Sequence, residues 1–150
     1  MSQITIRPAQ GRDFPQLLPM IHALAEHHGD TPSVTEADLL RDVLGTRRWL
    51  DVLVAEHEGV VAGYAALCPL AQLQFGMRGM DLHHLYVAPD GRGRGTGRAL
   101  IHAALAHCAD NGCRYMTVGT HPANEAAARL YAAAGFESLP PPGPRFRMRL

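Results

Sequence analysis

The residues best suited to binding a charged ligand gather between Val87 and Leu100, where the sequence reads VAPDGRGRGTGRAL. The strand predicted at 81–87 ends there and a helix-forming run begins, so this loop is predicted to join a strand to a helix N-terminus. Exposed amides at a helix N-terminus attract anions, and glycines let a phosphate approach the backbone. Arginines add positive charge at the same place. The sequence therefore predicts a site for a pyrophosphate or a 3′-phosphate. The residues concerned are Gly91, Arg92, Gly93, Arg94, Gly95, Gly97 and Arg98.

Three other interpretations of this loop have different requirements. A Walker A loop needs Gly-Lys-Ser/Thr, and the chain has no lysine, which also excludes Schiff-base enzymes. A Rossmann fingerprint that starts at Gly93 would need glycine where Arg98 stands, and an acidic ribose contact about 20 residues further on. A surface turn rich in glycine and arginine, with no ligand, is the remaining alternative.

The overall composition excludes further classes of protein. The 150 residues have a formal net charge of zero and show no basic stripe for nucleic acid. The cysteines form no CxxC pair, which argues against a disulfide framework or a zinc site and favours a reducing compartment. Neither a signal sequence nor an apolar stretch of the about 18 residues needed to span a membrane is visible. We therefore expect one domain, 1–150, located in the cytoplasm, without metal, nucleic acid or membrane as a partner.

Hydrophobic periodicity and turn residues predict the elements that would position the loop. Gly63 lies inside a predicted strand, which indicates a bulge or a close approach of another backbone. The order of strands and helices predicts an α/β fold, with helices on both faces of one sheet layer. Strands are expected at 4–7, 49–56, 60–68, 81–87, 113–120 and 146–150, and helices at 13–27, 35–44, 96–111 and 124–134.

The loop contains the pattern Arg-x-x-Gly-x-Gly, from Arg92 through Thr96 to Gly97, directly after Val87-Ala88-Pro89. Together with a second block, from Asn124 through Leu130-Tyr131 to Gly135-Phe136, this pattern resembles the GNAT superfamily of acetyl-CoA-dependent N-acetyltransferases. The two blocks occur in the family's order and on matching elements, and the resemblance covers essentially the whole chain. It implies the GNAT fold, with a mixed central sheet of about six to seven strands and helices on both faces.

The segments 24–45 and 53–65 resemble, more closely, the diamine (spermidine/spermine-type) branch of this family. Enzymes of that branch carry a Glu-Asp pair just before the residues that bind pantetheine. His83 and His84 stand at those positions here. A site that recognises polyamine cations through carboxylates would thus lack two charges here. The chain can belong to this branch without acting on the substrate of the branch.

The resemblance implies that a primary amine of a small-molecule acceptor attacks the thioester of acetyl-CoA in a ternary complex. An alkylamine with a pKa near 10.4 must first lose a proton, which costs about 4.6 kcal/mol at pH 7. Period-two geometry puts Asp81 and His83 on one face of the matching strand. His83 is predicted to be the base, with Asp81 orienting it or holding the ammonium. His84, if a bulge turned it to the same face, or water are the alternatives, as is plain hydrogen-bonded packing of the histidines.

Two residues of the second block match functional positions of the family. Tyr131 corresponds to the tyrosine that protonates the departing CoA thiolate, although a tyrosine there also anchors its helix by packing. Asn124 corresponds to a contact of the pantetheine arm and can cap its own helix. The resemblance further implies backbone pairing with pantetheine and a pyrophosphate cradle. The implied cofactor-binding residues are Leu85, Tyr86, Val87, Arg92, Gly93, Arg94, Gly95, Thr96, Gly97, Arg98 and Asn124.

The sequence leaves several properties open. A protein N-acetyltransferase is the alternative within the enzyme class, and a catalytically silent acyl-CoA-binding sensor or partner subunit is the alternative outside it. A homodimer is expected by resemblance, with 146–150 as an edge strand at the interface. The acceptor site is expected near 72–80, with Trp49, Tyr64 and Phe75 as lining residues or core. The cysteines Cys68, Cys108 and Cys113 are expected to be small core residues.

Overall fold

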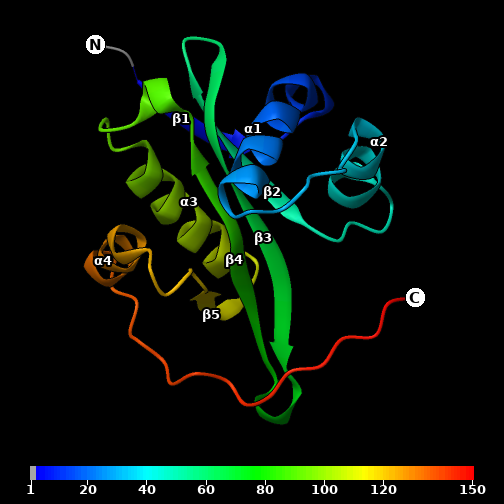
Figure 1. Ribbon diagram of the computed structural model, residues 1–150, viewed down its shortest axis with the longest axis vertical. Helices are drawn as coiled ribbons and strands as arrows, with labels where there is room; N and C mark the ends of the chain where they lie inside the picture. Colours follow the sequence, from blue (N-terminus) through cyan, green and yellow to red (C-terminus); the bar gives the residue numbers. More distant parts are fainter. Residues whose placement is uncertain (1–2) are drawn as a thin grey trace. The chain divides into compact units, whose positions relative to one another are not determined.

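The computed structural model describes residues 3–150, and the chain forms two compact units, Met1–Gly119 and Thr120–Leu150. The first unit is built on a five-stranded sheet in the order β1-β2-β3-β4-β5 (Figure 1). Neighbouring strands from β1 to β4 are antiparallel, whereas β5 is parallel to β4. The strands are β1 (Ile4–Pro8), β2 (Asp51–His57), β3 (Val60–Gln72), β4 (Met77–Val87) and β5 (Cys113–Val118).

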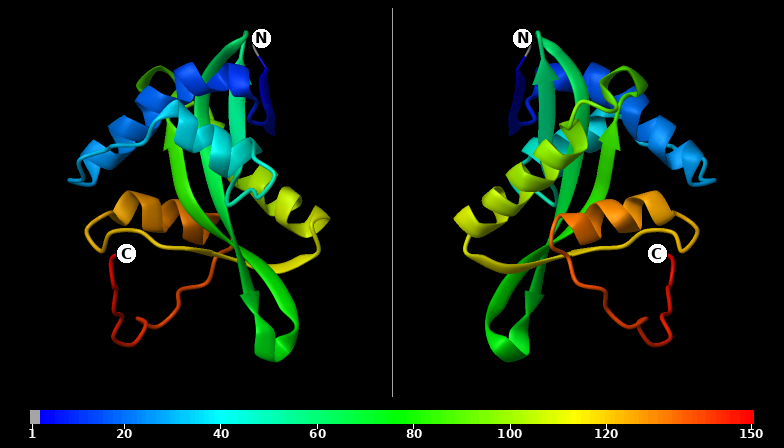
Figure 2. Two further views of the ribbon diagram at one scale, coloured as in Figure 1. Left: turned by 90° about the vertical axis from the view of Figure 1, so that its right-hand side faces the viewer. Right: turned by 90° about the vertical axis from the view of Figure 1, so that its left-hand side faces the viewer.

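Helices cover both faces of this sheet, as the sequence predicts (Figure 2). Two helices, α1 (Phe14–His27) and α2 (Glu36–Leu39), lie on one face, and a π-helical turn, Leu40–Leu44, continues α2. The third helix, α3 (Thr96–Asp110), lies on the other face and packs against all five strands. The mixed α/β arrangement is therefore confirmed.

Alternating side chains of the central strands build the two layers of the core. Val52 and Val54 of β2 pack with Phe14 and Leu17 of α1, and Tyr64 of β3 joins the same cluster. The intervening residues, which are equally buried, point to the other face and meet α3. On the strands these residues include Leu53, Ala55 and Ala65. The buried residues of α3 include Leu100, Ile101 and Ala104. The sheet is thus buried on both faces at its centre.

Thr35 begins α2 as the sequence predicts. Its hydroxyl accepts a hydrogen bond from the backbone N–H of Asp38, and the Asp38 carboxylate accepts one from the backbone N–H of Thr35. This reciprocal capping box satisfies two of the amides that a helix start leaves without partners.

Gly63 lies where two backbones come close together, which confirms the interpretation of a glycine inside a strand. A Cβ atom at this position would lie 2.5 Å from the carbonyl oxygen of Tyr86 on β4. The neighbouring β2–β3 register is also irregular, because Ala55 pairs with Gly63 whereas Glu56 pairs with Val61. Only glycine therefore lets β3 and β4 approach at this point.

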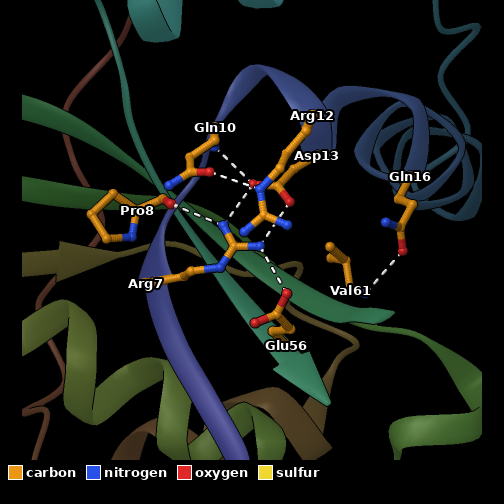
Figure 3. A network of polar contacts seen from close by, with 8 residues as sticks. All are labelled: Arg7, Pro8, Gln10, Arg12, Asp13, Gln16, Glu56 and Val61. Atoms are coloured by element: carbon orange, nitrogen blue, oxygen red, sulfur yellow. Dashed lines mark hydrogen bonds and ion pairs between the residues drawn. The ribbon is translucent and has the colours of Figure 1, made fainter. Parts of the chain in front are cut away.

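A polar network ties β1 to the start of α1 (Figure 3). The guanidinium of Arg7 donates to both carboxylate oxygens of Asp13, at 2.8 and 2.9 Å, and to Glu56 at 3.2 Å. Asp13 also accepts the backbone N–H of Gln10, at 2.7 Å, and its side chain is only 2% exposed. The hydrogen bonds from Arg7 hold the pKa of Asp13 below its usual range, so the buried carboxylate stays ionised.

The strands differ in number and length from those predicted. The described residues form five strands, fewer than the six to seven expected. The β3–β4 hairpin is longer than predicted, because β3 continues to Gln72 and β4 begins at Met77, and a short turn, Leu73–Phe75, joins them. Within 72–80, Gln72 and residues 77–80 are thus strand, since register with β3 extends the hydrogen bonding past the apolar pattern.

The second unit contains one helix, α4 (Glu125–Ala133), within the range predicted. The strand predicted at 146–150 is wrong, because residues 136–150 form no helix or strand. Arginine alternates there with apolar residues, but Phe146, Met148 and Leu150 are exposed rather than buried on one face. Alternation is only half of what a strand needs, since its backbone must also find a hydrogen-bonding partner.

Candidate functional site

A β-bulge at His83 changes the direction of the side chains on β4. Ala66 of β3 pairs with His84, whereas the next residue, Leu67, pairs with Leu82, so His83 is the extra residue on β4. A bulge shifts the alternation of a strand by one position. His83 and His84 therefore point to the same face, and their rings stack with centroids 4.4 Å apart and planes 13° apart. The bulge that would bring His84 to the face of His83 and Asp81 is therefore present.

Beyond the bulge, one edge of β4 has no strand beside it. Pairing with β5 reaches from Arg78 to Leu82. Leu85, Tyr86 and Val87 pair with β3 on their other side, and within residues 3–119 no strand follows them on the β5 side. Backbone N–H and C=O groups on that side, apart from the Val87 carbonyl that Arg92 engages, are available to an extended ligand that forms strand-like hydrogen bonds. This is where the resemblance predicts pantetheine.

The open edge of β4 leads into the glycine loop. After Pro89–Gly91, a single helical turn, Gly93 and Gly95 adopt left-handed backbone angles, with φ values of 78° and 79°. Gly95 is the N-cap of α3, and no side chain caps the first-turn amides of this helix. These amides are donors without intrahelical partners, so the start of α3 is suited to bind an anion. The loop thus has the geometry that a phosphate cradle requires.

The side chains of the loop divide between holding its shape and facing solvent. Thr96 is buried and donates from its hydroxyl to the carbonyl of Gly91, at 3.3 Å. Arg92 donates from Nε to the carbonyl of Val87, at 3.0 Å, and its guanidinium lies 5.9 Å from the centre of the Tyr86 ring. Arg94 and Arg98 are exposed and can offer positive charge to a ligand.

His84 is held in a neutral state beside Tyr64. The Tyr64 hydroxyl lies 3.0 Å from Nδ1 of His84, and the phenol is 1% exposed. Burial lowers the pKa of His84 to about 4, and the nearby charges of His83 and His28 add to this effect. Burial also raises the pKa of Tyr64, so the phenol keeps its proton and can donate it to Nδ1. Whichever of the two groups donates, the bond engages Nδ1 and leaves Nε2 as the unengaged ring nitrogen of His84.

Asp81 lies on the same face of β4 and is oriented by β5. Its Oδ1 accepts a hydrogen bond from the Thr117 hydroxyl, at 2.8 Å. Cys68 pairs with Asp81 across β3 and β4, and burial together with the Asp81 charge raises the pKa of the Cys68 thiol. His83, in contrast, is exposed. The structure therefore brings Asp81 and His83 to one face, as predicted, and adds Thr117 as a partner that the sequence pattern does not reveal.

Asn124 and Tyr131 belong to the second unit. The Asn124 side chain accepts from the backbone N–H of Ala127, at 3.1 Å, which confirms its role as the cap of α4. Tyr131 is partly buried, and its ring meets Phe136 edge-on with centroids 5.8 Å apart. Burial raises the pKa of Tyr131, so its phenol is protonated at neutral pH.

The remaining candidates have different surroundings. Trp49 and Phe75 are 73% and 66% exposed, and Phe75 lies at the tip of the β3–β4 hairpin, whereas Tyr64 is buried against His84. All three cysteines are free, and burial, with the neighbouring Cys113, raises the pKa of Cys108 to about 12. Among residues 3–150, no three His, Cys, Asp or Glu side chains gather closely enough to hold a metal ion. In the same range, no helix has the length and apolar character to cross a membrane.

The sequence pattern of the acetyltransferase (GNAT) family matches residues 20–136 of this chain. The match covers most of the chain, including α3, the glycine loop and α4. The chain therefore belongs to the GNAT acetyltransferase family.

The chain is similar in sequence to proteins named as N-acetyltransferases or N-acyltransferases. An N-acetyltransferase of Mycobacterium bovis, itself uncharacterized, is 36% identical over 86 residues, which are 57% of this chain and 52% of that protein. L-amino acid N-acyltransferase MnaT of Escherichia coli is 35% identical over 98 residues, 63% of this chain and 56% of that protein. The chain thus covers about half the length of these relatives. Thialysine N-epsilon-acetyltransferase of Sus scrofa is 28% identical over 149 residues, 93% of this chain and 87% of that protein.

Solved structures share the fold over the whole chain. An aminoglycoside N-acetyltransferase in complex with CoA has a TM-score of 0.79 at 22% identity, covering 100% of this chain and 97% of that one. A ribosomal-protein-alanine N-acetyltransferase from Brucella melitensis has a TM-score of 0.73 at 20% identity, covering 99% of this chain and 100% of that one. These likenesses confirm the GNAT fold that the sequence predicts.

Proposed function

We propose that this protein is an N-acetyltransferase that transfers the acetyl group of acetyl-CoA to a primary amine of a small-molecule acceptor, in a ternary complex. The observation that carries the proposal is the continuous path along β4. It runs from the bulge at His83, along a strand edge without a neighbour, to the uncapped N-terminus of α3. A proton acceptor, an edge for an extended arm and an anion cradle thus follow one another on a single stretch of chain.

The residues of this path fit acetyl-CoA. The amides from Gly93 to Arg98 and the exposed guanidinium groups of Arg94 and Arg98 are suited to its pyrophosphate. A Cβ atom at Gly93 or Gly95 would meet nothing within 4 Å, so the loop is open to a ligand. The backbone of Leu85, Tyr86 and Val87 is suited to hydrogen-bond the pantetheine arm. When bound, the thioester supplies the acyl group that the amine attacks.

His83 is the residue that we assign as the base. It is exposed on the face that also carries Asp81, so the ammonium group of an acceptor in solution can reach it. His84 is a poor base, because its Nδ1 is engaged by Tyr64 and its pKa of about 4 disfavours proton uptake at neutral pH. Asp81, fixed by Thr117, is suited to hold the acceptor ammonium or to orient His83.

Tyr131 is proposed as the acid that protonates the departing thiolate. Its raised pKa keeps the phenol protonated, which a general acid requires. Asn124 is proposed as a contact of the pantetheine arm in addition to its role as a cap. A homodimer and a cytoplasmic location complete the proposal, and size-exclusion chromatography with light scattering tests the first of these.

The acceptor is proposed from the names of the relatives. MnaT acts on L-amino acids, and the porcine relative acetylates the ε-amine of thialysine. The latter fits the diamine-like branch indicated by segments 24–45 and 53–65. Both support a small amine rather than a protein.

The test is release of CoA thiol from acetyl-CoA against a panel of amines that includes spermidine, lysine analogues, amino acids and aminoglycosides. Turnover on a small amine confirms the proposal and gives the acceptor class. Turnover on peptides alone would make the protein a protein N-acetyltransferase. Tight binding of acetyl-CoA with no turnover on any amine or peptide would identify it as a sensor instead.

A further inference from the structure

Arg92 extends from the glycine loop across the free edge of β4. Its Nε donates to the carbonyl of Val87, at 3.0 Å, and its guanidinium lies 5.9 Å from the centre of the Tyr86 ring. Val87 and Tyr86 are neighbours on the strand, so their side chains point to opposite faces of the sheet. Val87 Cγ2 would lie 3.7 Å from a Cβ atom at Gly97, in the first turn of α3, whereas Tyr86 packs against the core cluster on the α1 face. The arginine therefore passes over the edge of the strand.

The carbonyl that Arg92 engages faces the side of β4 on which β5 has ended. The hydrogen-bonding groups of successive strand residues point to alternate sides. Ala88 donates its N–H to the carbonyl of Ala62 on β3, at 2.8 Å, so the N–H and C=O of Val87 point away from β3. Leu85, two residues earlier, has the same direction. Of the carbonyls that this stretch of the edge offers to an extended ligand, the one at Val87 is thus already engaged.

A pantetheine arm that pairs with this edge competes with Arg92, because its amide N–H groups also need carbonyl acceptors. Displacing Arg92 breaks an exposed hydrogen bond and a contact with the Tyr86 ring. The displaced guanidinium regains a partner when the same ligand brings an anion to the start of α3, whose first-turn amides have no side-chain cap. A ligand without that anion leaves the cost of displacement uncompensated.

We propose that Arg92 determines which acetyl donors the site accepts. It closes the Val87 end of the free edge, and a donor that carries a pyrophosphate offsets the cost of opening it, because the displaced guanidinium binds the phosphate oxygens. The inference rests on the proposed function and makes the donor class thioesters of CoA rather than those of pantetheine or shorter thiols. Arginine suits both positions, since its planar fork can bond a carbonyl or a phosphate.

Two variants of Arg92 separate the bond to Val87 from the charge. Arg92→Gln has an N–H donor as many bonds from Cα as Nε of arginine, so it can retain the bond to Val87 without the charge. Arg92→Met has an aliphatic chain of similar length with neither donor nor charge. Arg92 is exposed, so both variants should fold. Arg94→Met is the control, because Arg94 lies on the same loop but lines a cavity beside His57 and Val60.

Pantetheine is the probe without a pyrophosphate, and NMR titration measures its affinity. Arg92→Met should bind it about fivefold more tightly than the unchanged protein, because the competing hydrogen bond is absent. Arg92→Gln and Arg94→Met should bind it like the unchanged protein. Affinities that are equal in Arg92→Met and Arg92→Gln, or no binding of pantetheine to Arg92→Met, would overturn the inference.

CoA is the probe with the pyrophosphate, and calorimetric titration measures its affinity. Arg92→Met should bind CoA about tenfold more weakly than the unchanged protein, since a charged donor to the phosphates is lost. The same substitution thus changes the affinities for CoA and pantetheine in opposite directions. If Arg92→Met bound CoA as tightly as the unchanged protein or more tightly, Arg92 would be only an obstacle, and the inference would be wrong.

The bond itself is observed in the free protein. The Nε–H of Arg92 should exchange with water more slowly than the Nε–H of Arg94 in NMR spectra, and its resonance should shift when CoA is added. Equal exchange rates would show that the bond to Val87 does not persist in solution and would overturn the inference. None of these measurements requires turnover, so they can support the inference even if no amine is acetylated. Acetylation of an amine, in turn, leaves the proposed function standing even if Arg92→Met gains no affinity for pantetheine.

Discussion

The hydroxyl of Tyr64 lies 3.0 Å from Nδ1 of His84, across the register that joins β3 to β4. This bond decides which ring nitrogen of His84 remains for a ligand. The phenol engages Nδ1, so Nε2 is the ring nitrogen of His84 that remains for a ligand. Its stacked neighbour His83 has no such constraint, so the two adjacent histidines have different chemical roles.

The neutral state of His84 predicts a pH dependence of stability. Its pKa in the folded protein is about 4 instead of the ordinary 6.5, so the unfolded chain binds the extra proton between these values. The free energy of unfolding should therefore fall as the pH is lowered from 6.5 toward 4. The full shift corresponds to about 3 kcal/mol, which partial exposure reduces to about 1–2 kcal/mol. Urea midpoints at pH 4.5, 5.5 and 6.5 measure this slope.

His84→Gln isolates this contribution, because glutamine retains a partner for Tyr64 and does not titrate. The variant should show a flatter dependence of the urea midpoint on pH than the unchanged protein. His102→Gln serves as the control and should keep the original slope. Equal slopes for His84→Gln and the unchanged protein would show that His84 is not held neutral by the fold.

Gly95 offers a test of the anion cradle at the start of α3. Its φ of 79° suits asparagine and aspartate better than other residues, and there is space for a side chain. Gly95→Asn and Gly95→Asp have nearly the same shape and differ in charge. We expect the aspartate variant to bind CoA about tenfold or more weakly than the asparagine variant, by repulsion from pyrophosphate. Calorimetric titration with CoA gives both affinities, and equal affinities would place the pyrophosphate elsewhere.

The sequence predicts the elements better than the details that create the site. The capping box of Thr35 and Asp38 and the glycine loop before α3 are local features, so local patterns reveal them. The sequence also contains a trace of the bulge. Leu82 and Leu85, which are buried and half-buried, lie three residues apart, whereas regular alternation would place inward-facing residues two apart. The length of the β3–β4 hairpin depends on inter-strand hydrogen bonds, which no pattern in either strand alone contains.

Contacts between distant residues account for what the sequence could not show. Tyr64 and His84 meet because of strand register, and Thr117 reaches Asp81 from a parallel strand. Neither pair has a spacing that a motif could record. The failed strand at 146–150 has the opposite cause, because its alternation is clear but no strand of the described chain pairs with it.

Tyr131→Phe tests the acid proposed for the leaving thiolate. Phenylalanine retains the edge-on contact with Phe136, so the fold and the affinity for CoA should be nearly unchanged. Loss of the phenolic proton should lower kcat by about 100-fold, the usual contribution of a general acid. Steady-state kinetics with a saturating acceptor measure this. If kcat is unchanged, Tyr131 is an anchor of α4 only.

Asp13→Asn tests whether the network of Figure 3 is structural. The substitution leaves Arg7, whose side chain is 16% exposed, without its bidentate partner and should destabilise the fold by about 3 kcal/mol. Glu56→Gln, which removes the longer and more exposed of the two ion pairs, should cost about 1 kcal/mol or less. Affinity for CoA should be unchanged in both variants. Equal losses of stability in urea would show that burial of Asp13 adds nothing to the pair.

The assignment of the base is tested by comparing His83→Gln with Asp81→Asn. The two residues share a face of β4, but Asp81 is hydrogen-bonded to Thr117 whereas His83 is exposed. If His83 accepts the proton, His83→Gln should lose most of kcat and the acidic limb of the pH–rate profile, since glutamine does not titrate. Asp81→Asn keeps an oxygen for the Thr117 hydroxyl and should retain the limb while raising KM for the amine. An acidic limb that persists in His83→Gln and disappears in Asp81→Asn would make Asp81 the base. A limb that persists in both variants would assign the proton to water, since a pKa of about 4 makes His84 a poor base at neutral pH.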